Sequence, residues 1–89
     1  MFKSRKNFLN QFYAMMPTTD ISGLGVALIV LDQNKKNIKG MKILANGNLQ
    51  KFDISHKLFQ ELIDNQRIEL VETAPDDVVE EMKQIYLHS

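Results

Sequence analysis

Two histidines, His56 and His88, are the side chains of this sequence best suited to acid or base chemistry near neutral pH. Neither has a carboxylate or hydroxyl at a spacing typical of a catalytic dyad. The chain contains no cysteine, which excludes a thiolate nucleophile, a thiolate metal ligand and a disulfide. We therefore expect a protein that is not an enzyme and that uses no cofactor and no small-molecule substrate.

Four carboxylates, Asp76, Asp77, Glu80 and Glu81, form a dense acidic group. Carboxylate oxygens one helical turn apart can bind a hard cation such as Ca²⁺. These residues also stand at the start of an expected helix, where acidic side chains interact favourably with the helix dipole and remain solvated. The second interpretation explains the group without a ligand, so we expect no metal site.

The charged residues are unevenly distributed, although the formal net charge is zero. The first 57 residues contain nine basic and three acidic residues, and the remainder contains two basic and eight acidic residues. The two parts therefore carry +6 and −6, which predicts a strong electrostatic dipole. The basic part suits nucleic acid or an acidic host protein as partner, and the dipole also suits head-to-tail self-association.

Much of the basic part belongs to expected strands. The β-branched run 26–31 is typical of a central strand that is buried on both faces. Further strands are expected over residues 38–45 and 48–54, on either side of Asn46-Gly47, the dipeptide preferred in a type I′ hairpin turn. That turn pairs Lys42 with Lys51 and Leu44 with Leu49.

The resulting alternation predicts a core face and a binding face on the hairpin. The core face contains Met41, Ile43, Phe52 and Ile54. Two lysines directly opposite each other cost up to about 1 kcal/mol unless an anion lies between them. With the lysines of the preceding turn and strand, the candidate binding residues are Lys35, Lys36, Lys39, Lys42, Leu44, Leu49 and Lys51.

Three interpretations of this face are possible, two with a binding function and one without. In the first, the lysines contact the phosphates of DNA or RNA in a non-enzymatic nucleic-acid-binding protein. In the second, Leu44 and Leu49 anchor a protein-binding inhibitor or adaptor, and the lysines steer an acidic partner. In the third, the face is solvated and its lysines only prevent edge-to-edge pairing of sheets.

Other segments complete the expected fold. Apolar residues at helical spacing predict a helix over residues 4–16, and Ser55 is expected to cap a second helix that ends near residue 65. A short strand is expected over 68–72, and Thr73, Pro75 and Asp76 mark the start of a last helix. The order α-β-β-β-α-β-α describes one α+β domain, residues 1–89, with helices packed on a mainly antiparallel sheet.

The apolar run 23–31 is too short to cross a bilayer, and no export signal is recognisable at the N-terminus. We expect a cytoplasmic protein, in keeping with the lack of cysteine.

The hairpin region resembles a known family. The stretch Leu28-Ile-Val-Leu-Asp32, Ile38-Lys39, Met41-Lys-Ile43 and Asn46-Gly-Asn-Leu-Gln-Lys-Phe52 is similar to the C-terminal double-wing DNA-binding domain of the middle-promoter activators of T-even-type bacteriophages. The resemblance covers about a third of the chain, and the family's separate N-terminal domain has no counterpart beyond the expected first helix. It implies a stand-alone wing module, a phage early protein that acts on host transcription, RNA or a defence system, and it transfers no catalytic residue.

Overall fold

The computed structural model describes residues 7–15 and 25–88. In these ranges the chain forms five strands and two helices. They are β1 (Gln11–Met15), β2 (Ala27–Gln33), β3 (Asn37–Ile43), β4 (Leu49–Ser55), α1 (His56–Asp64), β5 (Ile68–Thr73) and α2 (Asp76–Leu87).

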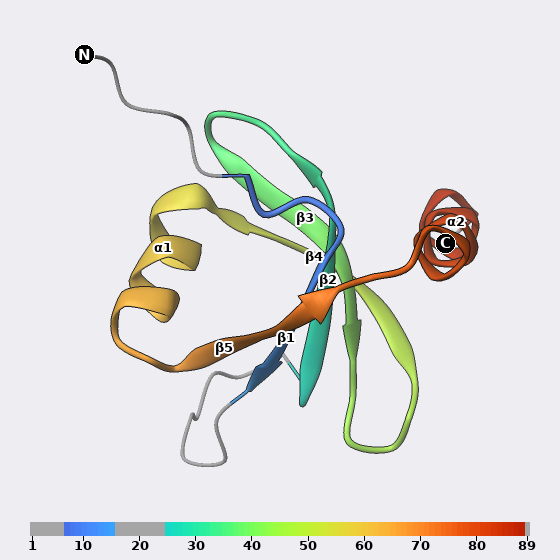
Figure 1. The fold of residues 1–89 in the computed structure, drawn as a ribbon, viewed down its shortest axis with the longest axis horizontal. Helices are drawn as coiled ribbons and strands as arrows, with labels where there is room; N and C mark the ends of the chain where they lie inside the picture. The colour runs from blue at the N-terminus through green and yellow to red at the C-terminus, as the bar shows by residue number, and fades with distance from the viewer. Residues whose placement is uncertain (1–6, 16–24, 89) are drawn as a thin grey trace.

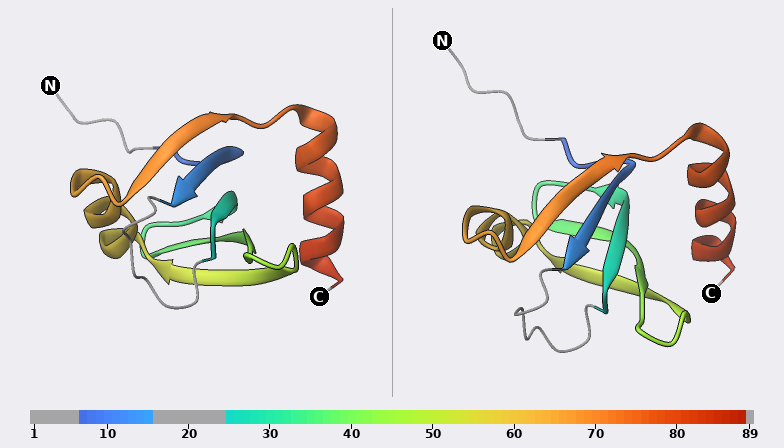
Figure 2. Two further views of the ribbon diagram at one scale, coloured as in Figure 1. Left: turned by 90° about the horizontal axis from the view of Figure 1, so that it is seen from below. Right: turned by 60° about the horizontal axis from the view of Figure 1, so that its bottom comes forward.

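The strands form a single sheet in the order β4-β3-β2-β1-β5, and every neighbouring pair is antiparallel. The sheet is strongly twisted, with α1 and α2 on opposite sides of it (Figure 1). Helix α1 connects β4 at one edge of the sheet to β5 at the other edge (Figure 2). The two edge strands are therefore far apart in the sheet although they are close in sequence.

Apolar side chains fill both sides of the sheet. On the side of α1, Phe59 and Leu62 belong to one cluster with Leu28 and Val30 of β2. On the side of α2, Val79 belongs to a second cluster with Ile29 and Leu31 of the same strand. The run in β2 is thus buried on both faces, which confirms the prediction of a central strand.

A glycine in β3 allows the strands to approach closely. A Cβ atom at Gly40 would collide with the carbonyl oxygen of Ile29 and would lie 3.0 Å from the Phe52 ring. Only a residue without a side chain fits between β2 and the ring from β4.

The prediction of an α+β domain with a mainly antiparallel sheet is confirmed, but the first element is wrong. Residues 11–15 form strand β1 instead of part of a helix, whereas residues 4–6 and 16 lie outside the described residues. Asn10 has φ of +64°, a left-handed conformation that is incompatible with the interior of a helix. Phe12 and Tyr13 then face opposite sides of the sheet, where both are packed against apolar clusters.

The other two helices agree better with the sequence. Ser55 caps α1, and its hydroxyl oxygen accepts a hydrogen bond of 3.0 Å from the Leu58 amide. Helix α2 begins at Asp76 with Pro75 as its N-cap, and Thr73 belongs to β5 rather than to the cap. Among the described residues, neither helix has the length and apolar character needed to cross a membrane.

Candidate nucleic-acid interface

The turn between β3 and β4 differs from the predicted type I′ turn. The Gly47 amide donates to the Leu44 carbonyl oxygen, and the Leu44 amide donates to the Asn48 carbonyl oxygen, each at 2.8 Å. Gly47 has φ of +89°, but Asn46 is not among the residues with positive φ. These features define a three-residue loop that ends in a left-handed glycine, the next most common hairpin connection.

The additional loop residue shifts the register of the hairpin by one position. Lys42 lies opposite Gln50, Met41 opposite Lys51, and Ile43 opposite Leu49. The predicted pairing of Lys42 with Lys51 is therefore wrong. Because side chains alternate along a strand, this shift places the two lysines on opposite faces of the sheet.

The predicted core and binding faces must be corrected as well. Met41 belongs to the cluster on the side of α2, whereas Phe52 and Ile54 belong to the cluster on the side of α1. Leu49 packs against the α2-side cluster, and Leu44 is half-buried beside the turn. The two leucines consequently do not form an exposed apolar anchor.

Each lysine of the two strands has its own surroundings. Lys39 lies opposite Asp32 of β2 and Asp53 of β4 in the strand register, so its charge has two acidic neighbours. The Lys51 ammonium lies 4.7 Å from the centroid of the Tyr86 ring of α2, a cation–π contact. Lys42 is opposite Leu28 and is half-buried on the face of α1. These three lysines do not form one continuous patch.

A different group of lysines lies at the end of the sheet where α1 begins. Lys35 and Lys36 are exposed in the turn between β2 and β3, and Lys57 is exposed at the start of α1. The His56 amide donates to the Lys36 carbonyl oxygen at 2.7 Å and joins the turn to the helix. We call Lys35, Lys36 and Lys57 the basic corner.

Hydrogen bonds fix the backbone of the basic corner. The Asn34 side-chain oxygen accepts from the amides of Lys36 and Asn37 at 2.7 and 2.8 Å. The Asn34 amide donates to the Asn37 carbonyl oxygen at 3.0 Å, which closes the turn. The three cationic side chains therefore extend from a defined turn and from a helix terminus.

Lys57 was missed in the sequence because the approach of its neighbour His56 to the turn depends on the hairpin register. Asn37 pairs with Ser55, so the residues just beyond the strand ends, Lys36 and His56, come next to each other. Counting back from a three-residue loop along strands of equal length would have placed His56 and Lys57 beside the turn that contains Lys36.

The strand order separates part of the acidic charge from the lysines. Between Asp32 and Asp53 the chain contains five lysines and no acidic residue, and this segment lies at the β4 edge. From β5 to the end of α2 it contains six acidic residues and one lysine, and two of the six, Glu69 and Glu72, are in β5 at the opposite edge. The other four are in α2, which packs against β2 and β3 and contacts Lys51 of β4 through Tyr86. Only the carboxylates of β5 are therefore separated from the hairpin by the width of the sheet.

His56 lies among aromatic rather than acidic side chains. His56 packs against Phe8 with ring centroids 5.5 Å apart, and its buried Nε2 atom has no hydrogen-bond partner. In the described ranges, no three His, Asp or Glu residues are close enough to hold a metal ion. Comparison with protein families, with curated proteins and with solved structures finds no match.

Proposed function

We propose that this protein is a non-enzymatic nucleic-acid-binding module that contacts phosphates through the basic corner. The main observation in favour of this function is that Lys35, Lys36 and Lys57 are all exposed. They belong to a turn and a helix start that a hydrogen bond joins. Lysines on a fixed backbone lose little further backbone entropy when they bind a phosphate. Phosphate contacts of this kind position the protein and carry no sequence information.

The distribution of charge supports the same function. The segment between Asp32 and Asp53, which contains Lys35 and Lys36 of the basic corner, has no acidic residue, and the carboxylates of β5 lie at the opposite edge of the sheet. A polyanion is therefore attracted to the basic corner and repelled by the β5 edge, which orients it during encounter. The resemblance to the phage double-wing domains favours DNA and a phage early protein acting on host transcription, RNA or a defence system.

The alternative of a protein inhibitor anchored on Leu44 and Leu49 has weaker support. Both leucines are at least half-buried, and Leu49 packs against the α2-side cluster. An anchor of that type must be free to enter a pocket of the partner.

The test is fluorescence anisotropy with a labelled mixed-sequence DNA duplex and an RNA duplex of the same sequence. Lys36→Glu should weaken binding to both duplexes, and it should lower the slope of log K against log salt for DNA by about 0.9, the value for one phosphate contact. Lys83→Glu, which makes the same change of charge on α2, is the matched control. Equal losses for the two variants, or no binding to either duplex, would overturn the proposal.

A further inference from the structure

Strand β5 leaves one side of its backbone without a partner strand. It is the last strand in the sheet order and pairs with β1 alone among the described residues. In an antiparallel strand, alternate residues direct their N–H and C=O groups away from the neighbouring strand. The outer side of β5 can therefore accept an additional strand.

The side chains of β5 are apolar on one face, where Ile68 is buried and Leu70 is exposed, and acidic on the other. Ile68 and Leu70 lie opposite Met15 and Tyr13, whose side chains belong to the α1 side. Glu69 and Glu72 lie opposite Ala14 and Phe12, on the α2 side. Leu70 is 49% exposed, a large value for an apolar residue within a sheet.

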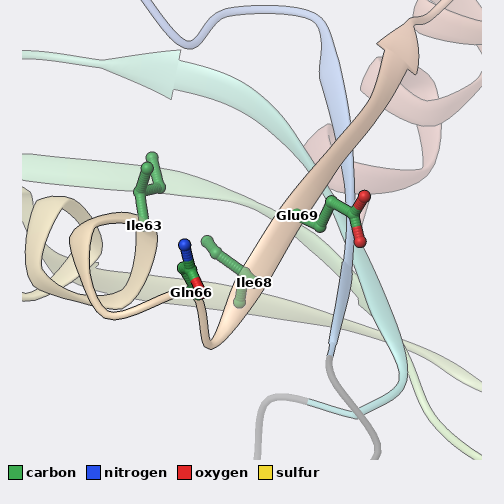
Figure 3. Close-up of a pocket in the computed structure, with 4 residues that line it drawn as sticks. All are labelled: Ile63, Gln66, Ile68 and Glu69. Atoms are coloured by element: carbon green, nitrogen blue, oxygen red, sulfur yellow. The ribbon is translucent and has the colours of Figure 1, made fainter.

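A cavity opens where α1 leads into β5. It has a volume of about 370 Å³ and is lined by Ile63, Gln66, Ile68 and Glu69. The side chains of Ile63, Gln66 and Ile68 approach one another, whereas the Glu69 carboxylate points away from them (Figure 3). Gln66 has φ of +59°, so the backbone turns sharply at the rim of this cavity. The cavity is large enough for one apolar side chain of a segment lying along β5.

The register of β5 limits how far a new strand can pair with it. The pairing with β1 shifts between Phe12 and Tyr13, which leaves Val71 as an extra, bulged residue. A bulge interrupts regular pairing at an edge. Uninterrupted pairing is therefore available over Ile68, Glu69 and Leu70, directly beside the cavity.

The charges exclude a second copy as the best occupant. Antiparallel pairing of two β5 strands over residues 68–70 places Glu69 of one copy opposite Glu69 of the other, and such like-charge pairs repel. Strand β4 of another copy offers Lys51, but Asp53 follows on the same face. A segment with several cations and no carboxylate fits the acidic face better.

We propose that the outer edge of β5 binds an extended segment of a partner protein that has lysine or arginine at alternate positions and apolar residues between them. One cation lies beside Glu69 and a second reaches Glu72 beyond the bulge. One apolar residue lies beside the exposed Leu70 and another enters the cavity that is lined by Ile63 and Ile68. Main-chain hydrogen bonds supply affinity and the alternating side chains supply specificity. This surface is separate from the basic corner, so it holds whether or not the protein binds nucleic acid.

The probe is a fluorescein-labelled peptide, Lys-Val-Lys-Leu-Lys-Val-Lys, whose binding is followed by anisotropy. Glu69→Lys combined with Glu72→Lys should weaken binding at least about tenfold, a change of 1.4 kcal/mol. Glu80→Lys combined with Glu81→Lys changes the charge equally on the exposed surface of α2 and should have a much smaller effect. Equal losses for the two double variants would overturn the proposal.

Backbone methylation of the peptide separates strand addition from simple charge attraction. A strand bonds to β5 through the amides of alternate residues only. N-methyl groups on one alternate set should therefore abolish binding, and those on the other set should not. Equal affinity of the two methylated peptides contradicts the proposal. The proposal is also contradicted if the protein forms a dimer without the peptide and hydrogen exchange at β5 is slower in that dimer. A second copy of the protein would then occupy the β5 edge.

Discussion

At the scale of single residues, Phe59 is the centre of the aromatic packing between α1 and the sheet. Its ring is 4.9 Å from that of Phe8 and 5.2 Å from that of Tyr13, and its side chain is fully buried. Phe59→Ala should lower the free energy of unfolding by about 3–5 kcal/mol, through lost burial and the remaining cavity. Leu58→Ala, at the exposed neighbouring position, should cost far less. Urea denaturation measures both, and similar losses would contradict this assignment of the buried face.

Tyr13 gives the domain a dependence on alkaline pH. Burial raises the pKa of its phenol from 10.0 to about 12, because the ionised form is poorly solvated in the core. The folded protein thus favours the neutral phenol. The contribution of this group to the free energy of unfolding is fully present below pH 10, and it is lost as the pH rises towards 12.

The measurement is an absorbance titration of the Tyr86→Phe variant, in which Tyr13 is the sole tyrosine. Its phenol should ionise well above pH 10, together with unfolding. Ionisation at the value of a free tyrosine while the fold persists would contradict the burial of the hydroxyl, which donates to the Gln11 side-chain oxygen at 2.7 Å.

At the scale of elements, the cap of α1 is the best test of a local sequence signal. The Ser55 hydroxyl oxygen satisfies the Leu58 amide, one of the amides without a partner inside the helix. Ser55→Ala should reduce the free energy of unfolding by about 1 kcal/mol, whereas Ser55→Asp should retain most of it because aspartate is an equally good cap. Thermal unfolding of the two variants makes the comparison. Equal destabilisation by Ala and Asp would show that the cap contributes little.

The sequence predicted an element where one local signal was sufficient. Ser55 marked the start of α1, and the uninterrupted apolar run marked β2 as the buried central strand. The prediction of the first element was wrong because Phe12 and Tyr13 are compatible both with one face of a helix and with the two sides of a sheet. The left-handed Asn10, which cannot be seen in the spacing of apolar residues, decides for the strand.

The candidate site depended on a finer feature than the existence of its strands. Asn46-Gly47 indicated the hairpin correctly, but a three-residue loop and a two-residue loop both accept glycine in its left-handed position. The difference of one residue decides whether Lys42 and Lys51 share a face. Local sequence does not settle it; the packing of Met41 and Phe52 against different helices does.

At the scale of the whole molecule, the sheet order decides which acidic residues lie away from the lysines. The crossover through α1 carries the chain from the β4 edge to the β5 edge, so Glu69 and Glu72 of β5 lie at the edge opposite the hairpin. Helix α2 then packs against β2 and β3, and its Tyr86 contacts Lys51 of β4, so its four carboxylates are not separated from the hairpin in this way. The proposed peptide surface follows from the crossover, whereas the basic corner follows from the register of the hairpin.

The uneven distribution of charge should control retention on a cation exchanger, although the net charge is zero. Replacing Lys35 and Lys36 by Glu, and Glu80 and Glu81 by Lys, keeps the net charge at zero and reduces the dipole. All four side chains are exposed, so the fold should be retained. The fourfold variant should elute at lower salt than the original protein, and Glu80→Lys with Glu81→Lys alone should elute at higher salt. Coelution of the fourfold variant with the original protein would mean that net charge alone determines binding to a charged surface.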